Sequence, residues 1–377
     1  MYMNFWYPIC TSEELEAAQP LRTQVMGLRF VAFHGADGKP CVLSDTCVHR
    51  GGSLGKGKVV DGCVACPYHG WRFAGDGKCQ LVPSLEAGAK PPARAKVDSY
   101  PVQEKYGIVF AFLGDLPEQE RSPLYEIEEY EDPAWRASEI MILEIDCFYE
   151  RSMENGVDPI HNEFVHPVQG SPQPIPGSIE HPETTWGSGV VGNYTELGKK
   201  MSDEEGMRSD PKVLNAGTWH HGPNTLITWI TFAKNTGLHQ YFFEAPVDGD
   251  KTKIYFINMR SFRLDAESDD VIREANLRVT TEDIAILENL HPIRTPATRT
   301  REILTAGDKA IVRYRDYLDE WSARGWRLDF KSLRENDGDV AYAIPCPERR
   351  RSGNWVLDPV PVIPASGKSA GRVDSAA

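Results

Sequence analysis

The first hundred residues alternate short apolar runs with turn sequences. The runs are rich in β-branched and aromatic residues, and Gly-Asp-type turns such as Gly35-Ala36-Asp37-Gly38 and Gly75-Asp76-Gly77 lie between them. This pattern is typical of an all-β domain. We expect strands at residues 28–33, 41–44, 58–64 and 108–113.

Longer elements follow an acidic, proline-containing stretch at residues 116–138, which we interpret as a linker. Helical patterns cover 150–166, 269–290 and 308–324, and strand patterns cover 139–149, 225–232, 238–246 and 253–262. The last two strands flank Asp248-Gly249-Asp250, a typical hairpin turn. Residues 170–182 are proline-rich and predict a loop, and we expect residues 365–377 to fray. The sequence predicts an α+β chain: a β domain at 1–115, a mixed domain at 139–345 and a tail at 346–377.

Composition narrows the classes of function. The chain has 377 residues and a formal net charge of −14, which argues against nucleic acid as its main partner. No apolar run reaches the roughly 18 residues of a membrane span, and the start does not resemble a secretory signal, so we expect a cytoplasmic protein. Of eight cysteines, six lie in the first 79 residues. In a reducing compartment such clustering points to metal binding rather than to disulfides.

Two short pairs in the β domain each combine one cysteine with one histidine. They are Cys47-x-His49 and Cys66-x2-His69, and glycines lie beside both. Tetrahedral zinc and a [2Fe–2S] cluster with two Cys and two His ligands both fit this donor set. Zinc fingers usually pair Cys with Cys and His with His, whereas each loop here carries one of each. The arrangement therefore favours the cluster, with zinc as the alternative.

A second constellation lies in the mixed domain, at Asp158-x2-His161-x4-His166. Two histidines and a carboxylate are the donor set of non-heme Fe(II) oxygenases. Asp158 and His161 would share a helical face, but His161 and His166 are about 140° apart on a regular helix. We therefore expect either a distorted helix or a helix that ends near His166, where Pro167 follows.

The helix predicted at 269–290 offers a third ligand. Asp283 lies in the middle of an apolar stripe, where a bare carboxylate would be costly to bury and a metal would remove the cost. Glu282 lies at the edge of the stripe, and we interpret it as a solvated ion-pair partner of Arg278. The stripe consists of Ile272, Ala275, Val279, Ile286 and Leu290.

Both motifs resemble those of the Rieske non-heme iron oxygenases, and the resemblance covers about residues 5–345. It implies a Rieske [2Fe–2S] domain and a helix-grip catalytic domain, in which an antiparallel sheet surrounds a helix. Cys47 and Cys66 would hold one cluster iron, and His49 and His69 the other. The mononuclear iron would be held by His161, His166 and Asp283.

The resemblance also assigns a role to Asp158. Asp158 would be hydrogen-bonded to His161 and would bridge to His69 of the partner subunit, which implies a head-to-tail homotrimer. The chain would be a terminal oxygenase that takes electrons from a ferredoxin or flavin reductase and activates O₂.

The length favours the α-only oxygenases, and hence monooxygenation of a small aromatic or alicyclic compound by hydroxylation or by O- or N-dealkylation. A ring-hydroxylating dioxygenase that gives cis-dihydrodiols is the alternative. An electron-transfer Rieske protein and a zinc-binding module are the remaining classes. The candidate pocket residues are Val157, Ile160, Trp219, Ile227, Trp229, Phe242 and Leu287.

Overall fold

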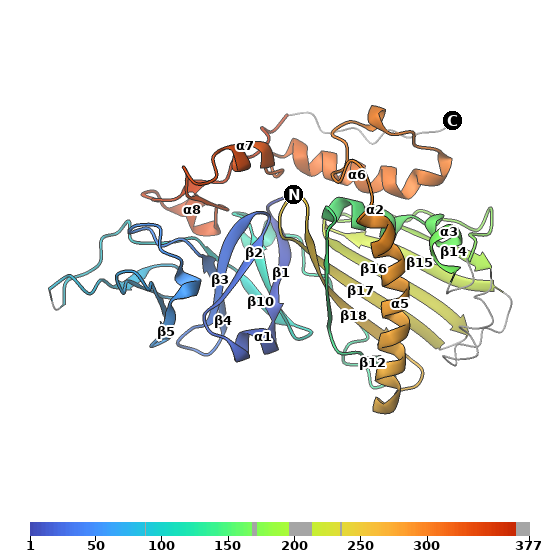
Figure 1. Cartoon of the computed structure of the whole chain (residues 1–377), viewed down its shortest axis with the longest axis horizontal. Helices are drawn as coiled ribbons and strands as arrows, with labels where there is room; N and C mark the ends of the chain where they lie inside the picture. The colour runs from blue at the N-terminus through green and yellow to red at the C-terminus, as the bar shows by residue number, and fades with distance from the viewer. Residues whose placement is uncertain (87, 168–171, 196–212, 234–235, 367–377) are drawn as a thin grey trace. The chain divides into compact units, whose positions relative to one another are not determined.

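The computed structural model describes the chain except residues 87, 168–171, 196–212, 234–235 and 367–377. The described residues divide into two compact units (Figure 1). The first consists of Met1–Leu124 together with residues 321–366, and the second contains the described residues of Tyr125–Glu320. The combination of a β-rich unit with a unit of sheet and helices confirms the predicted α+β class.

The first unit is built from small antiparallel sheets. The three sheets that carry it have the strand orders β1-β11-β10, β2-β3-β4-β9 and β5-β6-β7-β8. Their bounds are β1 (Phe5–Thr11), β2 (Leu21–Val25), β3 (Leu28–His34), β4 (Pro40–Ser44), β5 (Lys58–Val60), β6 (Cys63–Ala65), β7 (Arg72–Phe73), β8 (Cys79–Leu81), β9 (Ser99–Tyr100), β10 (Val102–Lys105) and β11 (Ile108–Leu113). The first helix of this unit, α1 (Ser12–Ala17), is short and begins with a capping box in which the Thr11 and Glu14 side chains each accept a hydrogen bond from the other residue's backbone N–H.

The chain returns to the first unit at its C-terminal end, which corrects the boundaries predicted from the sequence. Residues 321–345 belong with this unit and not with the mixed domain. The tail predicted at 346–377 contains ordered structure, because Asp98 accepts a bidentate hydrogen bond from Arg349 and the Cys346 and Val360 side chains are buried. The elements here are α7 (Phe330–Glu335), β19 (Tyr342–Ala343), α8 (Pro347–Arg351) and β20 (Asp358–Pro359).

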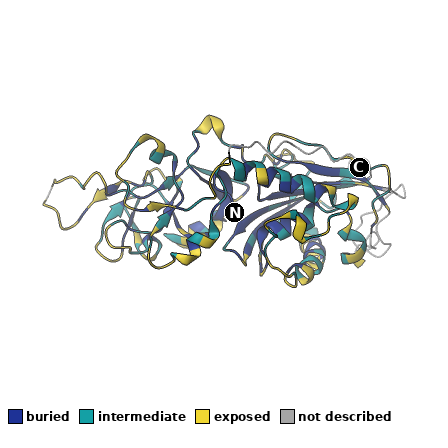
Figure 2. Cartoon of the chain, turned by 90° about the horizontal axis from the view of Figure 1, so that it is seen from above, coloured by how far each residue is buried: buried dark blue, intermediate teal, exposed yellow. Residues whose placement is uncertain are grey.

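The second unit is organised around a seven-stranded antiparallel sheet of order β12-β18-β17-β16-β15-β14, with β13 also pairing with β18. Figure 2 shows much of this sheet in dark blue, as buried residues. Alternate side chains point to opposite faces, so residues in register form rows across the strands. The bounds are β12 (Arg136–Ala137), β13 (Met141–Ile145), β14 (Gly189–Thr195), β15 (Val213–His221), β16 (Thr225–Ala233), β17 (Thr236–Pro246) and β18 (Thr252–Arg260).

The main helices of the second unit are α2 (Tyr149–Val157), α3 (His161–Val165), α5 (Asp269–Leu287) and α6 (Lys309–Ala323), whose last residues belong to the first unit. The single helix expected at 150–166 is interrupted at residues 158–160, because Pro159 lacks a backbone N–H and disfavours helix for the residue before it. Helix α5 crosses the sheet (Figure 1), and Leu287 packs in one apolar cluster with Ile145 and Ile254.

The end of α2 is held by a buried network of charges. Glu154 accepts two hydrogen bonds from the Arg315 guanidinium, at 2.6 and 2.8 Å, and Arg315 also donates to Glu302. Arg151 donates to the same Glu302 at 2.7 Å. Because these buried charges are paired, they hold α2 against α6. They therefore also fix the position of the segment that follows α2, which contains Asp158 and His161.

Candidate metal centres

The two Cys/His loops of the first unit have the same backbone design. In one loop Cys47 N–H donates to Gly52 and Gly51 N–H donates to Cys47; in the other, Cys66 N–H donates to Trp71 and Gly70 N–H to Cys66. Both Gly51 and Gly70 have φ of 72°, a left-handed conformation that favours glycine. Each loop is thus closed on itself by local bonds.

The side chains of these loops separate into a buried pair and an exposed pair. Cys47 and Cys66 are 2% and 3% exposed, whereas His49 and His69 are exposed and their rings lie 4.4 Å apart. A side chain at Gly52 would collide with Cys66 Sγ, so this glycine keeps space beside the thiol. Trp71 stacks on His49 at 4.6 Å.

The chemistry of the thiols fits a metal cluster. Burial, together with the neighbouring Cys66, raises the pKa of Cys47 to about 12. Two thiolates this close together in a buried place need a cation to stay ionised. The donor set of two buried thiols and two exposed imidazoles suits a [2Fe–2S] cluster with one iron inside and one at the surface.

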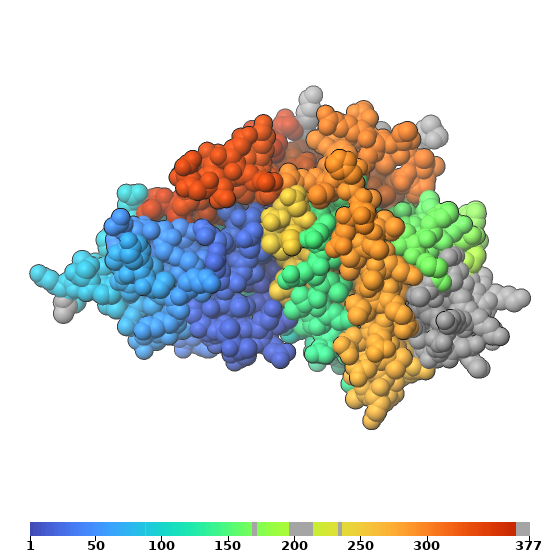
Figure 3. Space-filling model, in the orientation of Figure 1, coloured from blue at the N-terminus to red at the C-terminus, as the bar shows by residue number. Residues whose placement is uncertain are grey.

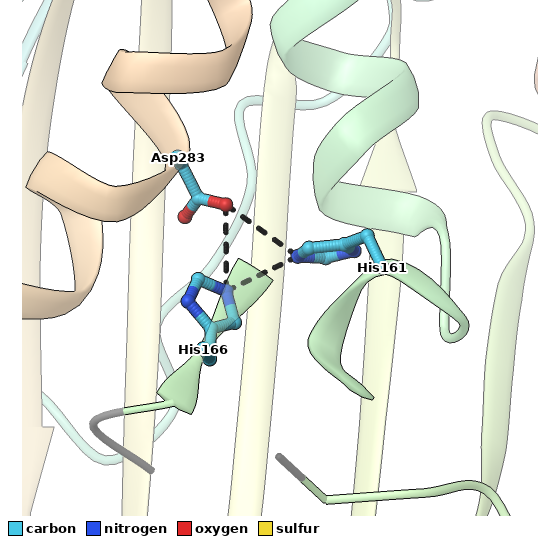
Figure 4. Close-up of side chains that lie close together, drawn as sticks. All are labelled: His161, His166 and Asp283. Carbon is cyan, nitrogen blue, oxygen red and sulfur yellow. Dashed lines mark hydrogen bonds and ion pairs between the residues drawn. The ribbon is translucent and has the colours of Figure 1, made fainter. Parts of the chain in front are cut away.

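In the second unit, His161, His166 and Asp283 come together (Figure 4). One ligand atom of each lies within 4.8 Å of the others. His161 Nε2 and His166 Nε2 are 3.2 Å apart, and Asp283 Oδ1 lies 3.5 and 3.4 Å from them. His161 opens α3, while His166 follows its end with φ −109° and ψ 63°. The expected end of the helix near His166 therefore allows both rings to face one point.

Three contacts orient these side chains. His161 Nδ1 lies 2.7 Å from the Asp158 carbonyl oxygen, and His166 Nδ1 lies 3.0 Å from Glu282 Oε2, so both rings present Nε2. Asn155 Nδ2 donates to Asp283 Oδ1 at 2.9 Å. Burial lowers the pKa of His161, which favours the neutral imidazole that a metal requires. The set therefore fits a 2-His-1-carboxylate iron site.

Two expectations about neighbouring carboxylates need correction. Asp158 does not share a helical face with His161, since it caps α2; its backbone carbonyl contacts His161, and its carboxylate accepts from Ile160 N–H. Glu282 points to His166 rather than lying on a solvated edge. Glu282 is adjacent in sequence to the predicted ligand Asp283, which is a hint that it lies at the site. The apolar stripe of the helix, however, gives no reason to expect that Glu282 contacts a ligand histidine.

The apolar stripe itself is only partly as expected. Ile272 and Ala275 are buried, but Ile286 is 48% exposed. Figure 3 shows that α5, in orange, forms part of the molecular surface. Asn276 and Thr280 are buried in place of Ile286. Helix α5 therefore turns a mixed polar and apolar face towards the site.

A cavity with about 130 Å³ of solvent-accessible space adjoins the three converging side chains. Of the seven predicted pocket residues, only Phe242 lines it. Trp219, Ile227 and Trp229 are the immediate sequence neighbours of Thr218, Leu226 and Thr228, and so they point to the opposite face of the sheet. Val157 is buried, Ile160 is 38% exposed, and Leu287 packs in an apolar cluster.

Comparison with known proteins agrees with both centres. Residues 5–101 match the Rieske [2Fe-2S] domain family, and residues 145–324 match the vanillate O-demethylase oxygenase C-terminal domain family. The chain belongs to the Rieske non-heme iron oxygenases. It is an oxidoreductase with a [2Fe–2S] cluster and a mononuclear non-heme iron, and it is a terminal oxygenase component. The family prediction and the fold prediction are confirmed.

Relatives similar in sequence and structure include demethylases. The methylxanthine N1-demethylase NdmA of Pseudomonas putida is 28% identical over 331 residues, which are 84% of this chain and 88% of NdmA. The solved structure of NdmA with caffeine superposes with a TM-score of 0.72 at 25% identity, over 85% of this chain and 91% of that one. Dicamba monooxygenase bound to dicamba has the same fold, with a TM-score of 0.70 at 23% identity over 84% and 96% of the two chains.

The vanillate O-demethylase oxygenase subunit of Pseudomonas sp. is 31% identical over 163 residues, 43% of this chain and 44% of that subunit. In the described part of the chain, no helix is long and apolar enough to cross a membrane. Members of the family take electrons from a ferredoxin or reductase and act with O₂ on small molecules.

Proposed function

We propose that this chain monooxygenates a small aromatic compound, with oxidative removal of an O- or N-methyl group as the leading reaction. The observation that carries the proposal is the cavity: it is bounded on one side by His161, His166 and Asp283, and on another by Phe242 and Leu226. An aromatic ring packed on these apolar side chains would place a methyl substituent beside the three ligands. NdmA and vanillate O-demethylase are named for such reactions.

In this proposal His161, His166 and Asp283 hold the iron, which supplies oxygen activation when it is bound. The chain's other residues orient the ligands: the Asp158 carbonyl and Glu282 fix the two rings, and Asn155 fixes Asp283. Val279 and Phe242 line the cavity and exclude water from the reacting bond.

A turnover assay tests the proposed reaction. The purified oxygenase, a ferredoxin, a reductase and NADH are incubated with methoxy- and N-methyl-substituted aromatic compounds, and formaldehyde and the demethylated product are quantified. We expect formaldehyde in proportion to demethylated product. Formation of cis-dihydrodiols without formaldehyde would show a dioxygenase instead.

We also propose a head-to-tail homotrimer that works in the cytoplasm. Exposed apolar side chains lie near both residues of the proposed bridge from Asp158 to His69 of the partner subunit: Phe164, six residues after Asp158, is 75% exposed, and Tyr68, next to His69, is 58% exposed. A neighbouring subunit would cover such side chains. All eight cysteines are free, which suits a reducing compartment.

Replacing Glu282 by glutamine is expected to lower iron affinity by roughly tenfold to a hundredfold, because the charged acceptor that orients His166 and raises its basicity is lost. Chelator competition, followed by iron analysis, measures the affinity. Glu274→Gln is the matched control, since Glu274 lies exposed on the same helix. Equal iron affinities in the two variants would show that Glu282 does not orient the ligand.

A further inference from the structure

A row of polar side chains crosses the floor of the cavity. Thr218 on β15 pairs with Thr228 on β16, Thr228 with Gln240 on β17, and Gln240 with Asn258 on β18. Thr218, Thr228 and Gln240 line the cavity, between apolar neighbours such as Leu226 and Phe242. Polar residues in register on a buried sheet face are costly unless their hydrogen bonds are met, so the direction of each bond in this row is informative.

At one end, a backbone carbonyl fixes the direction. Thr218 Oγ1 lies 2.8 Å from the Gly156 carbonyl oxygen, which can only accept, so the Thr218 hydroxyl donates there. Thr218 then accepts from Thr228 Oγ1, at 3.5 Å. The Thr228 hydroxyl proton therefore points along the row towards Thr218. The lone pairs of Thr228 Oγ1 can accept a hydrogen bond from a molecule in the cavity.

At Gln240, a second backbone carbonyl fixes the orientation of two side-chain amides. Asn276 on α5 places its Nδ2 3.1 Å from the Ile272 carbonyl oxygen, so its Oδ1 is the atom that accepts from Gln240 Nε2 at 2.8 Å. Because the Asn276 side chain is 5% exposed and makes two hydrogen bonds, it holds the Gln240 amide in one orientation. The Gln240 Oε1 oxygen is the atom left to accept, beside the one remaining N–H of that amide.

We propose that Gln240 determines specificity by accepting a hydrogen bond from an N–H or O–H group of the substrate, and that Asn276 is the positioning residue that aims it. This inference rests on the proposed function and names its substrate class: a neutral aromatic compound that carries a hydrogen-bond donor besides the group that is oxidised. The ring packs on Phe242 and Leu226, while its donor reaches Gln240 Oε1, with Thr228 Oγ1 as a second acceptor nearby.

Calorimetric binding to the resting, metal-loaded protein, without any reductant, tests the inference. The probes are two pairs in which a methyl group replaces the donor: theobromine and caffeine, and 2-methoxyphenol and 1,2-dimethoxybenzene. In at least one pair, the donor member is expected to bind about five- to tenfold more tightly, the worth of one neutral hydrogen bond. Gln240→Leu should remove this preference, and Asn276→Leu should reduce it.

Thr231→Val is the control, because Thr231 lies on the same strand as Thr228 but on the opposite sheet face, and it should keep the preference. Equal affinity within both pairs, a preference that survives in Gln240→Leu, or failure of all four probes to bind overturns the inference. Formaldehyde release by the wild type without any preference would leave the proposed function standing while the inference fails. A preference in binding without turnover of any methylated compound would contradict the proposed function alone.

Discussion

Replacing His161 by alanine is expected to abolish oxygenation while the protein keeps the visible absorption of its Rieske cluster. The reason is that the two centres share no ligand: His161 belongs to the second unit, whereas Cys47, His49, Cys66 and His69 all belong to the first. With one of two imidazoles gone, the remaining His166 and Asp283 form an incomplete site that should not retain iron.

Absorption spectra, iron analysis and product formation are measured together. The iron that remains in His161→Ala should equal the iron of the cluster alone. Cys66→Ser is the opposite control, because it removes a buried thiol ligand and should lose the colour. If His161→Ala loses the visible bands instead, the assignment of the two centres is wrong, and if it retains full turnover, His161 is not a ligand.

The cluster loops could be predicted from the sequence because their structure is local. Each loop is closed by backbone bonds between residues four or five apart, and the glycines that permit this lie inside the motif. The strand at Thr225–Ala233 could be predicted equally well, since almost all its residues are β-branched or aromatic. In contrast, the sequence pattern does not predict β14 and β15, because Gly189, Gly192 and Gly217 interrupt the apolar residues.

The lining of the cavity could not be predicted, because it depends on which face of each strand the helix covers. Ile227 and Trp229 are more apolar than Thr228, yet it is Thr228 that faces the cavity. A shift of the strand by one residue would exchange the two sets of side chains between the faces of the sheet. Which set faces the cavity depends on the packing of α5, whose buried face includes Asn276 and Thr280. Likewise, the role of Glu282 depends on His166, which is 116 residues away in the sequence.

Asp158 is the residue whose replacement should separate electron transfer from metal binding. Its carboxylate accepts a hydrogen bond from Ile160 N–H, and its carbonyl contacts His161. Asparagine can keep both contacts, because it retains an acceptor oxygen and the same backbone, but it loses the charge. Alanine loses the contact to Ile160 as well. The two variants therefore distinguish the charge of Asp158 from its part in the turn before α3.

We expect Asp158→Asn to retain both the cluster absorption and the mononuclear iron, yet to lose coupled turnover. In the proposed trimer the Asp158 carbonyl contacts His161, while its carboxylate would accept a hydrogen bond from His69 of the partner subunit. Stopped-flow absorption should show that the cluster is still reduced by the ferredoxin but is no longer reoxidised when substrate and O₂ are present. The oligomeric state, measured by analytical ultracentrifugation, should be trimeric for the wild type. Normal cluster reoxidation in Asp158→Asn would exclude the carboxylate as the bridge, whereas loss of iron in Asp158→Ala alone would assign Asp158 to the structure of the turn.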